Sequence, residues 1–139
     1  MNHLTHWLLL AALAFTGSAL ASEPIAVQPG HEQARIEGLI ASVEQAKGLV
    51  FIRNGSEHDA AAAAAHLRMK WKKAGSRVRT AEDFIKLCAT GSSMTGQKYQ
   101  IRLADGRLQD SADYFNAQLR RIDAAAKLPA AKISASKPG

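Results

Sequence analysis

The sequence predicts a single α+β domain with about four helices and a small antiparallel, hairpin-based sheet. Three observations support this fold class. Several segments place apolar residues at helical spacing. Two short segments are apolar or alternate like strands, and Asp105-Gly106 is a strong signal for a tight hairpin turn. The length of 139 residues is typical of one domain.

The first helix is expected soon after Pro29-Gly30. Its apolar residues recur at offsets of three, four and seven, which marks one helical face: Ile36, Leu39, Ile40 and Val43. Gly48 lies just beyond it, where a left-handed residue is favoured. The short apolar run at 49–52 is interpreted as a buried strand or an extended segment.

The second helix is expected after the turn Arg53-Asn54-Gly55, with Ser56 as its N-cap. Six consecutive alanines, the best helix formers, lie near its start. Small residues along its apolar stripe allow another helix to approach closely, and Trp71 fills the space near its end. Gly75 is expected to end this helix.

The third helix is expected to begin at Thr80, whose side chain caps the helix with Asp83 in a variant capping box. Cys88 should face inward as a buried, inert thiol. We expect Gly91 to end the helix in a left-handed turn and Gly96 to direct the chain into the next strand.

A hairpin and a last helix complete the domain. The segment 99–103 alternates like a strand, and 107–109 is expected to return after the Asp105-Gly106 turn. Ser111 is the expected cap of the last helix. The inner face of that helix consists of Phe115, Leu119 and Ile122.

The ends of the chain suggest export. Residues 1–21 have a polar start, an apolar run and the small-x-small ending Ala19-Leu20-Ala21, as in a cleaved secretory signal. The run is too short for a membrane span, so none is expected after cleavage; an uncleaved anchor is the alternative. The predicted organisation is signal 1–21, linker 22–31, α+β domain 32–123 and disordered basic tail 124–139. The predicted location is the periplasm or the exterior.

Composition narrows the possible functions. The net charge is +6, and a single cysteine excludes an internal disulfide, so the hydrophobic core must stabilise the domain. The segment 68–79 carries six basic residues and no acid. It could contact an anionic polymer or lipid, or simply form a solvated basic face. Export argues against nucleic acid as a partner.

Two polar groups could bind an anion. Arg53, Asn54 and Gly55 precede a helix start, where free N–H groups and an arginine suit a carboxylate or a phosphate. The alternative is that the caps satisfy these donors and Arg53 pairs with an acid. His66 and Lys70 lie one turn apart and could line a cleft, although a lone helical histidine is more often a packed or surface residue.

The segment at 87–100, LCATGSSMTGQKYQ, is the third candidate. Its serines follow the C-terminus of a helix, where partial negative charge disfavours an alkoxide. We therefore interpret it as scaffold or contact surface. Its candidate binding residues are Ser92, Ser93, Thr95, Gly96 and Tyr99. No metal motif or cofactor motif supports the few local donors, so no metal and no cofactor is predicted.

Four blocks together resemble the YfeK-like family of small exported bacterial proteins of unknown function. They are residues 51–55 (FIRNG), His66-Leu67 with Lys70, residues 80–85 (TAEDFI), and the Ser-Ser-x-Thr-Gly run with Tyr99. The resemblance covers about residues 32 to 123. It implies an exported, helix-rich single domain and no particular activity.

The favoured function is a non-catalytic exported module that binds a small anionic ligand or an envelope partner. The alternative is a hydrolase or transferase that uses Ser92 or Ser93 with His66 as base. A weaker possibility is a purely structural or assembly role, because the edge of the hairpin could pair with a partner strand.

Overall fold

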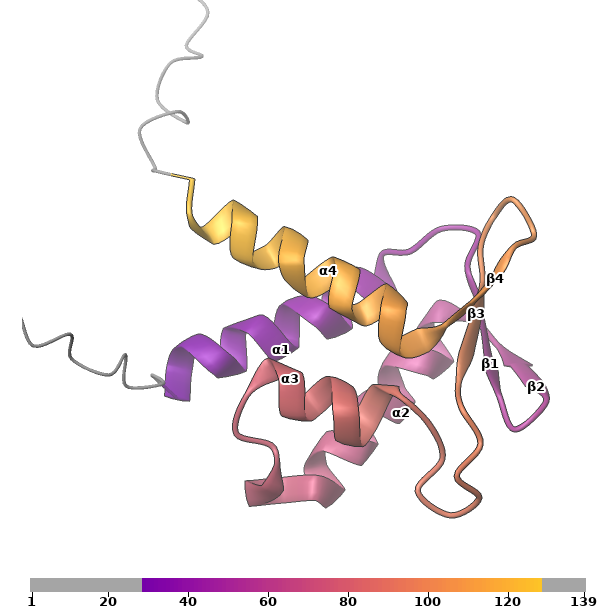
Figure 1. The fold of residues 1–139 in the computed structure, drawn as a ribbon, viewed down its shortest axis with the longest axis horizontal. Helices are drawn as coiled ribbons and strands as arrows, with labels where there is room; N and C mark the ends of the chain where they lie inside the picture. The colour runs from indigo at the N-terminus through magenta and orange to yellow at the C-terminus, as the bar shows by residue number, and fades with distance from the viewer. Residues whose placement is uncertain (1–28, 129–139) are drawn as a thin grey trace, which may run out of the picture.

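The sheet and the helices form two sides of the domain in the computed structural model, which describes residues 29–128 (Figure 1). The predicted signal, most of the linker and most of the tail lie outside this range. The long helices are α1 (Pro29–Glu44), α2 (Ala60–Ala74) and α4 (Ser111–Ala126). The short α3 (Ala81–Phe84) continues into a π-helical segment, η2 (Ile85–Ala89), and η1 (Gly75–Arg77) is a 3-10 turn. The predicted α+β class is confirmed.

The first and the last helix extend into segments that were predicted as linker and tail. Helix α1 begins at Pro29, and α4 continues to Ala126. Among the described residues, no helix combines the length and the apolar character needed to cross a membrane.

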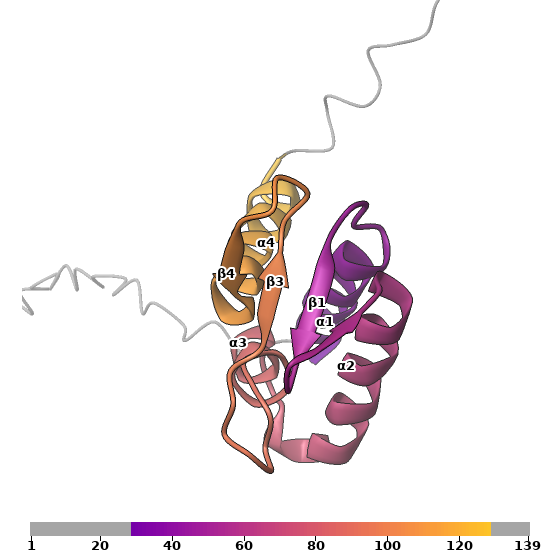
Figure 2. The same ribbon diagram turned by 90° about the vertical axis from the view of Figure 1, so that its right-hand side faces the viewer.

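Four short strands form one antiparallel sheet in the order β2-β1-β3-β4. They are β1 (Val50–Arg53), β2 (Ser56–His58), β3 (Gln100–Arg102) and β4 (Leu108–Asp110). The central pair places Phe51 opposite Ile101, and both side chains are buried. In Figure 2 the strands face the viewer and the helices lie behind them, so the helices cover one face of the sheet.

The turn at Asn54-Gly55 corrects one prediction. Ser56 is not a helix cap but the first residue of β2. Asn54 and Gly55 both have positive φ, 49° and 77°, as a two-residue hairpin turn requires. Asp59 is the N-cap of α2 and accepts a hydrogen bond from the Ala62 N–H at 2.8 Å. The Asn-Gly pair sets a hairpin at a point where the serine suggested a helix start.

The helices and the sheet all contribute side chains to the hydrophobic core. Fully buried residues include Leu39 and Val43 of α1, Ala64 of α2 and Phe115 of α4. Ala64 and its neighbours allow the close approach of α1 and α2 that the alanine stripe predicted. Gly75 ends α2 with φ of 53°, also as predicted. Cys88 is fully buried, and burial raises the pKa of its thiol.

A partly buried arginine links three helices. Arg35 of α1 donates to Glu32 at 2.9 Å, to Glu82 at 2.8 Å and to Asp123 of α4 at 2.9 Å. Glu32, only 6% exposed, also accepts the Ala81 N–H at 2.8 Å, at the start of α3. Because a buried carboxylate is costly without a partner, this network fixes how α1, α3 and α4 dock.

Two further local predictions are corrected. Ser111 is the first residue of α4, and its N-cap is Asp110, which makes no capping bond and instead accepts from Lys98 Nζ at 2.9 Å. The capping box at Thr80 and Asp83 is present as predicted. Gly91, however, does not have positive φ. A Cβ at this position would come within 2.7 Å of the Gln97 carbonyl oxygen, so Gly91 is needed for close approach.

Replacing Gly91 with alanine should lower the free energy of unfolding by about 1–3 kcal/mol, because backbone must move to make room. Urea denaturation of the full chain measures this. The control is Gly30→Ala, where a Cβ meets nothing within 4 Å and where no loss is expected. Equal stability of the Gly91 variant and the wild type would show that the loop yields without cost.

Candidate functional site

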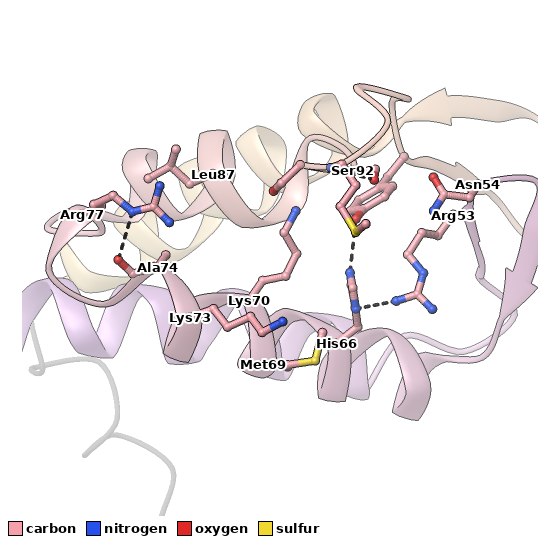
Figure 3. A pocket seen from close by; sticks show the side chains of 13 residues that line it. Arg53, Asn54, His66, Met69, Lys70, Lys73, Ala74, Arg77, Leu87 and Ser92 are labelled. Carbon is pink, nitrogen blue, oxygen red and sulfur yellow. Dashed lines mark hydrogen bonds between the residues drawn. The ribbon is translucent and has the colours of Figure 1, made fainter.

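Segments distant in the sequence line one cleft of about 410 Å³, mainly three of them, with one residue each from η1 and η2 (Figure 3). The end of β1 and its turn contribute Arg53 and Asn54, α2 contributes its His66 face, and the loop before β3 closes the opposite side. We call this feature the cationic cleft. Its lining residues are Arg53, Asn54, His66, Met69, Lys70, Lys73, Ala74, Arg77, Leu87, Ser92, Ser93, Met94 and Tyr99. The volume falls in the range of small-molecule sites.

The charge in the lining has one sign. Four cations, Arg53, Lys70, Lys73 and Arg77, line the cleft, and no aspartate or glutamate does. Within residues 29–128, none of the four forms a salt bridge with a carboxylate. The alternative that Arg53 pairs with an acidic side chain is therefore wrong for the residues that the structure describes. Clustered cations without counter-charges attract anions.

His66 lies between two polar partners at one end of the cleft. Arg53 Nη1 contacts His66 Nδ1, and His66 Nε2 lies 3.2 Å from the Tyr99 hydroxyl oxygen. A guanidinium only donates, so Nδ1 accepts and the neutral ring carries its proton on Nε2. That N–H donates to the Tyr99 oxygen, which leaves the Tyr99 hydroxyl hydrogen available to an acceptor in the cleft.

Lys70 is held at the centre of the cleft. Its Nζ donates to the Gly91 carbonyl oxygen at 2.6 Å and lies 5.0 Å from the centroid of the Tyr99 ring. Burial lowers the pKa of Lys70, and Arg53 lowers it further, against an opposing contribution from Cys88. An ammonium carries three N–H bonds, so Lys70 keeps donors for a ligand after its bond to Gly91.

The serine-rich loop is built by its own hydrogen bonds. The Ser92 N–H donates to the Gln97 carbonyl at 2.9 Å, and Ser92 Oγ accepts the N–H groups of Met94 and Thr95, each at 3.3 Å. Gly96 has φ of 71°, so the left-handed residue of this loop is Gly96 and not Gly91, of which it was expected. Thr95 Oγ1 donates to Asn54 Oδ1 at 3.3 Å, which links the loop to the β1–β2 turn.

Most of the predicted candidates come together. Seven of them line the cationic cleft: Arg53, Asn54, His66, Lys70, Ser92, Ser93 and Tyr99. Gly55, Thr95 and Gly96 do not line it; the two glycines shape the turns on either side, and Thr95 joins those turns. The free N–H groups of a helix start, which motivated the choice of residues 53–55, are not the reason for this position, because a hairpin turn occupies it.

Lys73 and Arg77 belong to the basic segment 68–79, but neither they nor the apolar residues of the cleft were among the predicted ligand-binding residues. His66, Met69, Lys70 and Lys73 are three or four residues apart and therefore share one helical face, which Arg77 extends past the end of α2. That spacing was visible in the sequence. Leu87 and Met94 carry no comparable signal, because η2 and the loop determine where their side chains point.

The hydrogen bonds of His66 and of Ser92 go to other groups than each other. Both ring nitrogens of His66 are engaged by Arg53 and Tyr99, and Ser92 Oγ faces its own loop backbone. Among the described residues, no group of three or more histidine, cysteine, aspartate or glutamate side chains could hold a metal ion.

The environment of His66 lowers its pKa to about 4, first through burial and then through the positive charges of Arg53 on β1, Lys70 on α2 and His58 on β2. His66 should therefore reduce stability in acid. From pH 6.5 down to about 4, the unfolded chain binds a proton that the native ring does not. After solvent screening, the expected loss is roughly 1–2 kcal/mol.

Urea denaturation across this pH range tests the effect, with His66→Gln as the control. Other groups titrate in both proteins, so the informative quantity is the difference between the two stability curves. We expect the wild type to lose more stability than the variant as the pH falls. Parallel curves would contradict a neutral, buried His66.

Comparisons with known proteins find a family and a curated relative of this chain. The family described as "Family of unknown function (DUF5329)" matches residues 30–123. The uncharacterized protein YfeK of Salmonella typhimurium is 44% identical over 69 residues. That alignment covers 50% of this chain and 58% of the relative, so the chain spans little more than half of the relative's length. The predicted YfeK-like resemblance is confirmed. No solved structure matches the chain.

Proposed function

The chain belongs to the family of unknown function DUF5329, and from the cationic cleft we propose that it is an exported, non-catalytic module that binds an anionic ligand. The observation that carries this proposal is the convergence of four cations in one cleft that no acidic side chain lines. Binding a negative group there would offset their mutual repulsion and satisfy donors that the protein leaves free.

The neutral hydrogen-bonding groups support the same class of ligand. Tyr99 offers its hydroxyl hydrogen because its oxygen already accepts from His66. Ser92 and Ser93 line the cleft beside Lys70. A carboxylate or a phosphate presents several acceptors close together, which matches this set of donors.

The non-catalytic part of the proposal rests on the engaged state of His66. A serine-dependent reaction would need His66 to leave Arg53 or Tyr99 and reach a hydroxyl.

The export part of the proposal rests on residues 1–21, which resemble a cleaved signal. N-terminal sequencing of the protein recovered from cells tests it, and Ser22 is expected as the first residue.

Calorimetric titration of the full chain with inorganic phosphate at low salt tests the binding. We expect saturable binding that Arg53→Ala weakens at least about tenfold, or 1.4 kcal/mol, with little change in melting temperature. The matched control is Arg102→Ala, which removes a strand arginine that pairs with Glu57 outside the cleft. Equal loss in both variants, or no saturable binding, would contradict the proposal. If the Arg53 variant unfolds, Arg53 is needed for the stability of the domain.

A further inference from the structure

We propose that the ligand of the cationic cleft is an amphiphile with an oxyanion head group and one apolar arm. This inference rests on the proposed function and specifies its ligand. The cleft combines a cationic centre with apolar side chains that a small inorganic anion would leave uncovered. The two kinds of surface lie side by side on the same helix face and the same loop.

The head group would bind where the donors converge. Lys70 Nζ lies 5.0 Å from the centroid of the Tyr99 ring, and the Tyr99 hydroxyl hydrogen is free because His66 donates to its oxygen. Arg53 lies on the other side of His66 (Figure 3). An oxyanion that accepts hydrogen bonds from Lys70 and Tyr99 would be held both by electrostatic attraction and by directional hydrogen bonds.

The apolar arm would lie against Met69, Leu87 and Met94, which line the same cleft. Met69 is 46% exposed and Met94 is 96% exposed, so two of the four exposed large hydrophobic side chains among residues 29–128 border this one feature. Exposed apolar groups gathered at a cleft indicate a binding surface. Methionine is flexible and polarizable, so it adapts to an alkyl chain of varied shape.

The chemistry of the lining disfavours other ligands. A cation would meet four like charges, and a neutral alkyl compound would leave the donors of Lys70 and Tyr99 without acceptors. The same head group could come from a free amphiphile or from a lipid in a membrane. The experiment must therefore separate these two sources.

Calorimetric titrations of the full chain with four probes test the inference: inorganic phosphate, octyl phosphate, octanoate and octanol. Octyl phosphate should bind at least about tenfold more tightly than phosphate, because its chain leaves water. Octanoate should bind and octanol should not. If phosphate binds and the octyl chain adds nothing, the inference fails and the proposed function stands. If no anion binds, both fail, and octanol binding as tightly as octyl phosphate overturns the inference.

Matched variants identify the apolar surface. Met69→Ser should reduce the advantage of octyl phosphate over phosphate at least about threefold, more than it changes the affinity for phosphate itself. Leu108→Ser removes another exposed apolar side chain outside the cleft and should change neither. Equal effects of the two variants would overturn the placement of the arm.

Sedimentation with phosphatidylglycerol vesicles separates the two sources of the head group. A free amphiphile predicts little co-sedimentation, and octyl phosphate should abolish any that occurs. Strong vesicle binding that octyl phosphate does not compete would overturn the inference in favour of a membrane-surface contact.

Discussion

Replacing Arg35 with methionine should lower the free energy of unfolding by about 3–5 kcal/mol, because the buried carboxylate of Glu32 would lose its positively charged partner. Glu32 is 6% exposed and would keep its bond to the Ala81 N–H but lose both bonds from Arg35. Asp123 would lose its contact as well. At about 4 °C or more per kcal/mol for a domain of this size, the melting temperature should fall by more than about 12 °C.

Glu82→Gln is the control for this network. Glu82 also accepts from Arg35, at 2.8 Å, but its side chain is 59% exposed. Exposed pairs contribute about 0–1 kcal/mol, so the control should remain close to the wild type. Thermal and urea denaturation of both variants measure the difference. If the two variants lose equal stability, Arg35 does not act through the buried carboxylate of Glu32.

Replacing Lys70 with methionine should weaken the binding of octyl phosphate by about 10- to 100-fold, the effect of losing a charge-assisted hydrogen bond worth about 1.5–3 kcal/mol. Stability should change little. Burial already lowers the pKa of Lys70, so methionine removes a poorly solvated charge at the cost of one bond to Gly91. Titration calorimetry and urea denaturation of the same sample separate the two effects.

Lys72→Met is the matched control, because it makes the same chemical change two residues along the same helix. Lys72 is exposed and does not line the cationic cleft. General attraction to the net charge of +6 would weaken binding equally in both variants. A site at Lys70 predicts a loss in the Lys70 variant alone.

Much of the fold could be predicted from local patterns. The inner face of α1, the alanine stripe of α2 and the capping box of α3 each repeat or pair within a few residues, so short-range chemistry decides them. Ser56 was misassigned because a hydroxyl suits both a cap and a strand start, and the Asn-Gly pair decides between them. Gly91 was misassigned because its role is a contact with Gln97 across the loop, which no local pattern reveals.

The candidate site was predicted in pieces. Arg53, His66 and Ser92 each carried a local argument. The antiparallel pairing of β1 with β3 brings Arg53 and the loop that leads into β3 to one cleft, which α2 lines with His66. Helical spacing could have added Met69 and Lys73 to His66. Leu87 lies in the π-helical segment η2, and no pattern in the sequence signals such a wider turn.

The most direct test of the cationic cleft is an NMR titration of the isotope-labelled full chain with octyl phosphate, followed at every backbone amide. We expect saturable shifts confined to the β1–β2 turn, to α2 from His66 to Lys73 and to the loop from Ser92 to Tyr99. Shifts spread over the other basic surfaces, or shifts that do not saturate, would contradict a defined anion site in this cleft.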